Sequence, residues 1–142
     1  MRISTRGEYG LRSMLVLARL YREGPVSLRE IAQREQISVQ YLEQLFRELR
    51  KEGLVNSHRG TRGGYQLALP PGATSIGSIL RTLEGPLGPM QCVMNAAHDP
   101  GCCPHVVGKC PTRVLWKRLK HSIDSVLDET TLADLLTQVD EE

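Results

Sequence analysis

The run SVQYLEQLFRELRKEGLVNSHRGTRGGYQLAL, residues 38–69, carries the clearest structural pattern in this chain. Its first part, 38–51, predicts a helix that Ser38 can cap and whose apolar residues recur at helical spacing. The apolar face comprises Tyr41, Leu42, Leu45, Phe46 and Leu49. The opposite face is polar and comprises Gln40, Glu43, Gln44 and Arg47. This division predicts a helix that packs on a core by one side and leaves the other side exposed.

The second part of the run predicts a β-hairpin. Residues 54–55 and 65–69 read as short strands, the second with alternate residues up to Leu69 directed inward. The loop between them, RGTRGG, is rich in glycine and holds Arg59 and Arg62. A hairpin with cations at its tip is typical of the wing of a winged helix, where arginine can enter the minor groove of DNA.

The residues before this run complete a helix-turn-helix. Ser27 and Glu30 form a capping box that opens a short helix, and a turn at about residues 36–37 separates it from the helix at 38–51. An earlier helix runs from about residue 4 to residue 21. Two short helices joined by a tight turn and followed by a hairpin predict a winged helix-turn-helix.

Positive charge is concentrated in the same half of the chain. Residues 1–70 hold 12 Lys and Arg against 7 Asp and Glu, whereas residues 71–142 hold 6 against 9. Eleven of the twelve N-terminal cations are Arg, whose planar group suits phosphates and guanine edges. We therefore expect this half to bind double-stranded DNA.

Groove chemistry suggests what the polar side chains do. In the major groove Gln40 can pair with adenine, Arg47 with guanine or phosphate, and Glu43 can accept a hydrogen bond from cytosine. Glu43 would then reject wrong sequences, or else it is an exposed helix-forming residue without contact to DNA. The residues predicted to bind DNA are Ser38, Gln40, Glu43, Gln44, Arg47, Arg59 and Arg62.

Beyond the hairpin the chain predicts three helices and one long loop. Ser75 starts a short amphipathic helix, and residues 85–111 then lack periodicity, which in a compact domain indicates a functional or a disordered segment. A helix follows from Thr112, and a last one spans about 132–139. The apolar stripe of the long helix comprises Leu115, Trp116, Leu119, Ile123, Val126 and Leu127. It predicts a dimer seam suited to a near-palindromic operator, with packing against the first helix as the alternative.

All four cysteines lie in CVMNAAHDPGCCPHVVGKC, residues 92–110. Cysteines gathered on one loop can hold a soft metal ion or an iron–sulfur cluster. Nine residues separate Cys92 from Cys102 and six separate Cys103 from Cys110, whereas zinc sites usually hold cysteine pairs about two to four residues apart. We therefore expect a loop wrapped around an iron–sulfur cluster, with three cysteines and one other ligand or with all four cysteines.

Over nearly its whole length the chain resembles the winged-helix iron–sulfur regulators of the IscR, NsrR and RirA type. The matching motifs are MRIST-x-G-x-YGLR, S-x-x-YLEQLF-x-x-LR-x-x-GLV, RG-x-x-GGY, SI-x-x-IL-x-x-LEGP and C-x-T-x-x-LW. The resemblance implies a winged-helix dimer that exchanges its long helix and binds an operator. It also implies Cys92 and Cys110 as the outer cluster ligands, Cys102 or Cys103 as the middle one, and Glu43 and Arg59 in DNA recognition.

The resemblance leaves the fourth ligand open. Some members use a His three residues after the last Cys, where this chain has Arg113, which cannot ligate. Others use a carboxylate near the N-terminus, supplied by the partner subunit, and Glu8 stands at that position. Glu8 can also simply face solvent or phosphate, and His98 and His105 inside the loop are further candidates. A 2Fe–2S cluster is favoured over a 4Fe–4S cluster.

We therefore expect a mainly α protein with a DNA-binding domain at 1–84, a cluster loop at 85–111 and a dimerisation helix with a C-terminal helix at 112–142. It would be a cytoplasmic regulator, repressor or activator, because no apolar run approaches the ~20 residues of a membrane span and MRISTRGEYG is no signal segment. A Gly-rich nucleotide loop, a catalytic triad and a C-x2-C pair are all missing, which argues against an enzyme. The alternative is the same fold with zinc, thiol redox or a partner protein in place of the cluster.

Overall fold

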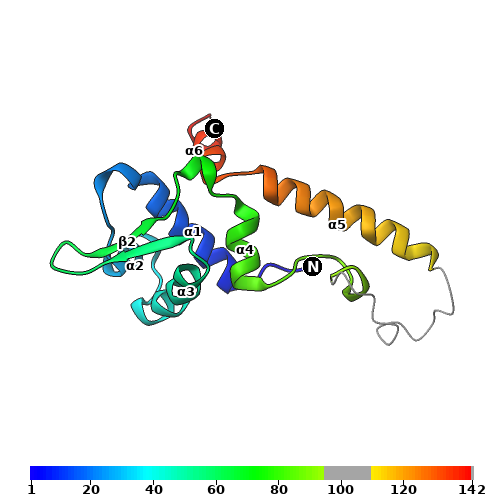
Figure 1. Cartoon of the computed structure of the whole chain (residues 1–142), viewed down its shortest axis with the longest axis horizontal. Coiled ribbons are helices and arrows are strands. Elements are labelled where there is room, and N and C mark those ends of the chain that lie inside the picture. Colours follow the sequence, from blue (N-terminus) through cyan, green and yellow to red (C-terminus); the bar gives the residue numbers. More distant parts are fainter. Residues whose placement is uncertain (95–109, 142) are drawn as a thin grey trace.

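The computed structural model describes residues 1–94 and 110–141 (Figure 1). In these ranges the chain is mainly helical with one two-stranded antiparallel sheet, and the predicted winged helix-turn-helix is confirmed. The helices and strands are α1 (Thr5–Arg19), α2 (Leu28–Glu35), α3 (Val39–Lys51), β1 (Val55–His58), β2 (Gly64–Leu67), α4 (Ile76–Glu84), α5 (Pro111–Glu129) and α6 (Leu132–Glu141). Short 3-10 turns lie between them, namely η1 (Tyr21–Glu23), η2 (Pro71–Ala73) and η3 (Gln91–Val93).

Serine side chains begin three of the helices, as the sequence predicts. The hydroxyl of Ser27 accepts a hydrogen bond from the backbone of Glu30 at 3.1 Å, and Ser38 and Ser75 cap α3 and α4 in the same way. Between α2 and α3, Gln36 adopts the left-handed conformation with φ 55°. It ends α2 and turns the chain directly into α3, which completes the helix-turn-helix.

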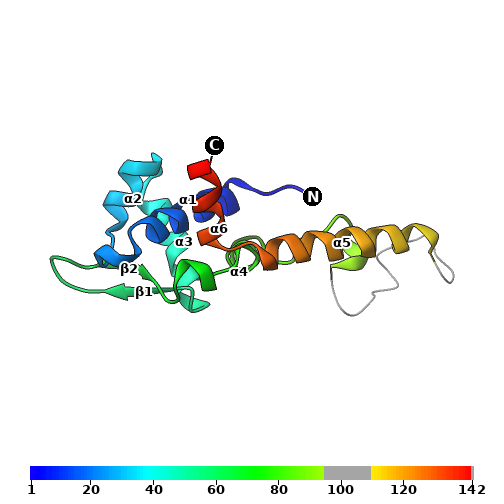
Figure 2. The ribbon, with the colours of Figure 1, turned by 90° about the horizontal axis from the view of Figure 1, so that it is seen from above.

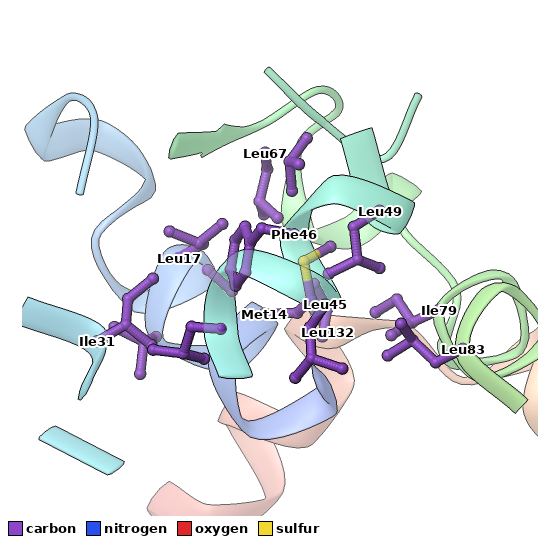
Figure 3. Close-up of a cluster of buried hydrophobic side chains, with 14 of the residues drawn as sticks. Met14, Leu17, Ile31, Leu45, Phe46, Leu49, Leu67, Ile79, Leu83 and Leu132 are labelled. Carbon is purple, nitrogen blue, oxygen red and sulfur yellow. The ribbon is translucent and has the colours of Figure 1, made fainter. Parts of the chain in front are cut away.

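The core lies between α1, α3, α4 and the wing, and α6 closes it from the side (Figure 3). Leu42, Leu45, Phe46 and Leu49 of α3 are fully buried, which confirms the predicted apolar face, while Tyr41 at its edge is partly buried. Other elements contribute Met14, Leu17, Ile31, Leu67, Ile79, Leu83 and Leu132. We call α1–α4, the wing and α6 the head.

The wing is anchored at its base. In the β1–β2 pair, Val55 lies opposite Leu67 and His58 opposite Gly64. β2 is also bonded on its other side, because Val26 and Tyr65 exchange backbone hydrogen bonds of 2.9 and 2.8 Å. Only glycine fits at position 64, since a Cβ there would collide with the carbonyl group of Val26. The strand ends at Leu67, so Leu69, expected to point inward, is exposed.

The long helix α5 runs away from the head, and Figures 1 and 2 show its first turn at the opposite end of the molecule from the tip of the wing. Its later part is held by α4 and by the residues that follow α4. Arg81 of α4 donates to Asp124 at 2.8 Å, and Lys120 donates to the carbonyl of Leu87, three residues after α4, at 3.0 Å. The chain then returns to the head, where Leu132 of α6 is fully buried. None of the helices in the described ranges combines the length and apolar character needed to cross a membrane.

Candidate functional site

The polar face of α3 is open to solvent. Gln40, Glu43, Gln44 and Arg47 are all exposed, and Ser38 is exposed at the start of the helix. Because the other face of α3 is fixed in the core, this polar face has a defined orientation relative to the head. A rigid helix with uncovered amide, carboxylate and guanidinium groups has the chemistry for reading base edges.

The wing presents its cations in the same uncovered way. Arg59 and Arg62 lie in the turn between β1 and β2 and are exposed. Within residues 1–94 and 110–141 neither of them, nor Arg47, has an acidic side chain at ion-pair distance. Other arginines of the head are neutralised inside the chain, for example Arg34 by Glu30. Arg47 of α3 and Arg59 and Arg62 of the wing therefore remain available to bind phosphates.

Two side chains connect α3, which we call the recognition helix, to the rest of the head, one of them directly and the other through α1. Arg6 on α1 forms an ion pair with Glu48 on α3 and donates from Nε to the carbonyl of Leu83 at 3.1 Å. Glu84, the last residue of α4, accepts hydrogen bonds from the backbone N–H groups of Ser4 and Gly7 at 2.9 and 3.0 Å. The end of α4 therefore fixes the first turn of α1, and α1 in turn contacts α3. No local sequence signal indicates these contacts.

Glu8 is engaged within its own helix. Its carboxylate accepts a hydrogen bond from Arg12 Nε at 2.8 Å, and Arg12 also lies 3.5 Å from the carboxylate of Glu35 at the end of α2. The hydrogen bond with Glu8, followed by its charge, raises the pKa of Arg12. This guanidinium thus links the candidate ligand Glu8 to the helix-turn-helix.

Cys92 and Cys110 are brought to the same end of α5. Cys92 lies in η3, which packs against α5, and Cys110 is the residue directly before that helix. The sulfur of Cys110 lies 3.2 Å from the hydroxyl of Thr112. This hydrogen bond, aided by the backbone N–H and charge of Arg113, lowers the pKa of the Cys110 thiol. The surroundings of Cys110 therefore favour the thiolate, the form that binds metal.

Arg113 lies close to both of these cysteines. Its Nη2 lies 3.5 Å from the carbonyl oxygen of Cys92, at the limit of a hydrogen bond. Its Nε is buried and has no hydrogen-bond partner within the described part of the chain. The sequence identifies Arg113 only as a residue that cannot ligate, and its contact with Cys92 depends on the packing of η3.

The remaining candidate ligands are not joined into one site by the described residues. Cys102, Cys103, His98 and His105 lie outside the residues that the structure describes. Among those that it does describe, no three His, Cys, Asp or Glu side chains are close enough to hold one metal ion. Within a single chain, Glu8 is therefore not assembled with Cys92 and Cys110.

The family model for Rrf2, described as an iron-dependent transcriptional regulator, matches residues 3–138. The HTH-type transcriptional regulator CymR of Bacillus subtilis (strain 168) is 44% identical over 142 residues, which is 100% of this chain and 94% of CymR. The HTH-type transcriptional regulator IscR of Yersinia pestis is 36% identical over 140 residues, 99% of this chain and 82% of IscR.

Solved structures of the same two kinds of regulator resemble the fold. CymR of B. subtilis, described as the global cysteine regulator, has a TM-score of 0.79 at 43% identity, over 97% of this chain and 98% of that chain. IscR of T. potens also has a TM-score of 0.79, at 41% identity, over 99% of this chain and 90% of that chain. These proteins are transcription regulators rather than enzymes, and the resemblance to IscR-type regulators is confirmed. The chain belongs to the Rrf2 family of transcriptional regulators.

Proposed function

We propose that this regulator is a homodimer whose binding to an operator depends on an iron–sulfur cluster held by its cysteines. The observation that carries the proposal is the packing of η3 against α5, which holds the first and last cysteines of the loop at the same end of one helix. The similarity to IscR supports a cluster, whereas the similarity to CymR, named a cysteine regulator, keeps thiol chemistry as the alternative.

The donor set fits a cluster better than a small metal ion. Cys92 and Cys110 would supply two thiolates, and Cys102 or Cys103 a third. The buried Nε of Arg113 is a hydrogen-bond donor without a partner among the described residues, and a cluster sulfur would accept a hydrogen bond from it. A bound cluster would supply sensitivity to oxidants, nitric oxide or iron supply.

The fourth ligand in this proposal is the Glu8 carboxylate of a second copy, with His105 as the competing candidate. Glu8 does not meet Cys92 and Cys110 within the described part of one chain, so it requires another subunit to reach them. Glu8 would have to leave Arg12 to ligate, and Arg12 would keep its contact with Glu35 on α2. Ligation and the position of the helix-turn-helix would thereby be linked.

A second route to the DNA-binding face runs through α4. Arg81 joins α4 to Asp124 of α5, and the last residue of α4, Glu84, caps α1. Arg6 of α1 then contacts α3. We therefore infer that a shift of α5 alters the tilt of the recognition helix. The proposed dimerisation part at 112–142 would in this way act on the proposed DNA-binding part at 1–84, on either side of the loop at 85–111.

The proposed DNA contacts follow the uncovered polar groups. α3 would enter the major groove with Gln40, Glu43, Gln44 and Arg47, with Ser38 near phosphate. Arg59 and Arg62 of the wing would reach the minor groove or its phosphates. The amide and guanidinium groups of α3 would discriminate between bases, whereas the wing would contribute salt-dependent affinity.

The decisive experiment is purification without oxygen, followed by a visible spectrum and analysis of iron, zinc and acid-labile sulfide. We expect a brown protein with broad visible absorption and with both iron and sulfide. Cys110→Ala should lose iron, because it removes a thiolate, whereas Ser122→Ala, an exposed polar change on α5, should retain it. A colourless preparation with stoichiometric zinc would contradict the cluster, and full iron in Cys110→Ala would contradict this ligand.

A further inference from the structure

Arg113 combines a fixed position with unused hydrogen-bonding capacity. It lies in the first turn of α5, three residues after Cys110, and is partly buried. A guanidinium has five N–H donors, stays charged in proteins and cannot bind iron. In the described residues its one side-chain hydrogen bond is the long contact from Nη2 to the carbonyl of Cys92. Its buried Nε donates to nothing there.

The charge of Arg113 is also unbalanced within the described part of α5 and its neighbours. The ion pairs along α5 join Lys120 and Arg81 to Asp124 and Asp128 and do not include Arg113. A half-buried cation without a carboxylate partner is unfavourable unless an anion lies nearby. Cys92 and Cys110 lie close to Arg113, and they would supply negative charge when they ligate a cluster as thiolates.

We propose that Arg113 is a positioning and tuning residue of the cysteine site, which donates a hydrogen bond to a sulfur of the bound cluster and thereby makes the cluster easier to reduce. The inference rests on the proposed function, because it assumes that Cys92 and Cys110 hold the cluster. Hydrogen bonds to sulfur and nearby positive charge both stabilise the more negative, reduced state. On reduction one electron comes from the external reductant, and Arg113 keeps its proton.

The test compares three variants with the wild-type protein, all purified without oxygen. Arg113→Gln removes the positive charge. Arg113→Lys keeps the charge but replaces the planar guanidinium and its N–H donors by an ammonium group. Arg118→Gln is the control, because it removes one exposed positive charge from the same helix. Each protein is titrated with dithionite in the presence of redox mediators, while the visible spectrum and the electron paramagnetic resonance of the reduced cluster are recorded.

We expect the reduction potential of Arg113→Gln to be clearly more negative than that of the wild type, with iron content unchanged. The potential of Arg113→Lys should fall between the two, and that of Arg118→Gln should match the wild type.

If Arg113→Gln and Arg118→Gln have the same reduction potential, the inference is wrong although the cluster proposal stands. If both Arg113 variants fold but lose their iron, Arg113 holds the loop rather than tuning it, which also overturns the inference. A wild-type protein without iron and sulfide would overturn the cluster proposal itself, and this inference with it.

Discussion

Glu84 shows how one side chain can fix the geometry of the head. Its carboxylate receives the backbone N–H groups of Ser4 and Gly7, and its negative charge lies at the N-terminus of α1. We expect Glu84→Ala to lower the free energy of unfolding by about 1–3 kcal/mol, because these two N–H groups and the hydroxyl of Ser4 lose a charged acceptor. Glu84→Gln should cost less, since its amide oxygen can still accept. Urea unfolding at fixed protein concentration measures both.

The control for Glu84 is Glu52→Ala. Glu52 is an exposed residue at the end of α3 that makes no side-chain hydrogen bond within the described ranges. Its replacement should change the free energy of unfolding by less than about 0.5 kcal/mol. Equal effects at the two positions would show that the cap contributes nothing specific.

Among the side chains of the wing, Arg59 allows the sharpest prediction about DNA binding. We expect Arg59→Ala to weaken binding to an operator selected from random duplexes by about tenfold or more, because a cation leaves the minor groove. The slope of log affinity against log salt should become shallower by about 1 per protomer. Fluorescence anisotropy over a range of salt concentrations measures both quantities. Arg22→Ala, which removes an exposed arginine of η1, should change neither quantity. If Arg22→Ala weakened binding as much as Arg59→Ala, the effect of Arg59 would be that of its charge alone and not of its place in the wing.

The side-chain contacts that could be predicted from the sequence are those between residues close together along the chain. The caps of Ser27, Ser38 and Ser75 join residues only three positions apart, so the motif itself contains both partners. Glu84 and Arg113 have partners 77 or more and 21 positions away along the chain, respectively. Such contacts depend on how α4, η3 and α5 pack, and no spacing in the sequence encodes that packing.

At the scale of elements, the junction of α4 with α5 depends on half-buried charged side chains. Partial burial tends to raise the pKa of Asp124, but the hydrogen bonds and charges of Lys120 and Arg81 outweigh burial and hold this pKa below its ordinary value. A carboxyl group whose pKa falls on folding stabilises the protein at pH values above its unfolded pKa of about 3.9. That stabilisation is lost as pH falls through the lower, folded pKa.

We therefore expect Asp124→Asn to lower the free energy of unfolding by on the order of 1 kcal/mol at pH 7. The difference from the wild type should begin to shrink below about pH 4, where the carboxyl group becomes neutral in the unfolded wild-type chain before it does so in the folded one. Urea unfolding from pH 7 to 3.5 measures the effect. Glu129→Gln makes the same chemical change at an exposed position of α5 and should be nearly silent. A difference that stays constant over this pH range would rule out the ion pair as its cause.

The elements themselves were largely predictable, because each has its own pattern. Apolar periodicity marks α3 and α4, and a glycine-rich loop between two short strands marks the wing. The orientation of α5 was not predictable in this way. Its apolar stripe is compatible with packing on α1 or on another chain, and only the tertiary structure leaves Leu115 and Val126 exposed, at 54% and 64%.

At the scale of the whole molecule, a compact head carries a long helix that projects from it and leaves several apolar residues uncovered by the described chain (Figures 1 and 2). The exposed apolar residues of α5 are Val114, Leu115, Leu119 and Val126. Exposed apolar residues gathered on one helix mark an interface. A second copy suits it because an operator read by two heads requires a two-fold protein, and because Glu8 reaches the cysteines only from another subunit in the proposed site.

We expect the double change Leu115→Glu and Leu119→Glu to convert the dimer to a monomer at micromolar concentration. Both side chains are exposed in the single chain, at 54% and 42%, so the head should keep its stability while the interface loses apolar contact and gains repelling charges. Sedimentation velocity measures the oligomeric state. Binding to the full operator should weaken by about 100-fold or more, because the second head no longer adds its affinity, while binding to an isolated half-site should change little.

The control for this double change is Lys117→Gln with Arg118→Gln. It also lowers the net charge by two on exposed positions of α5, and it should leave the dimer intact. A wild-type protein that sediments as a monomer, or a double variant that still dimerises, would place the interface elsewhere and remove the reason for a ligand supplied by the partner.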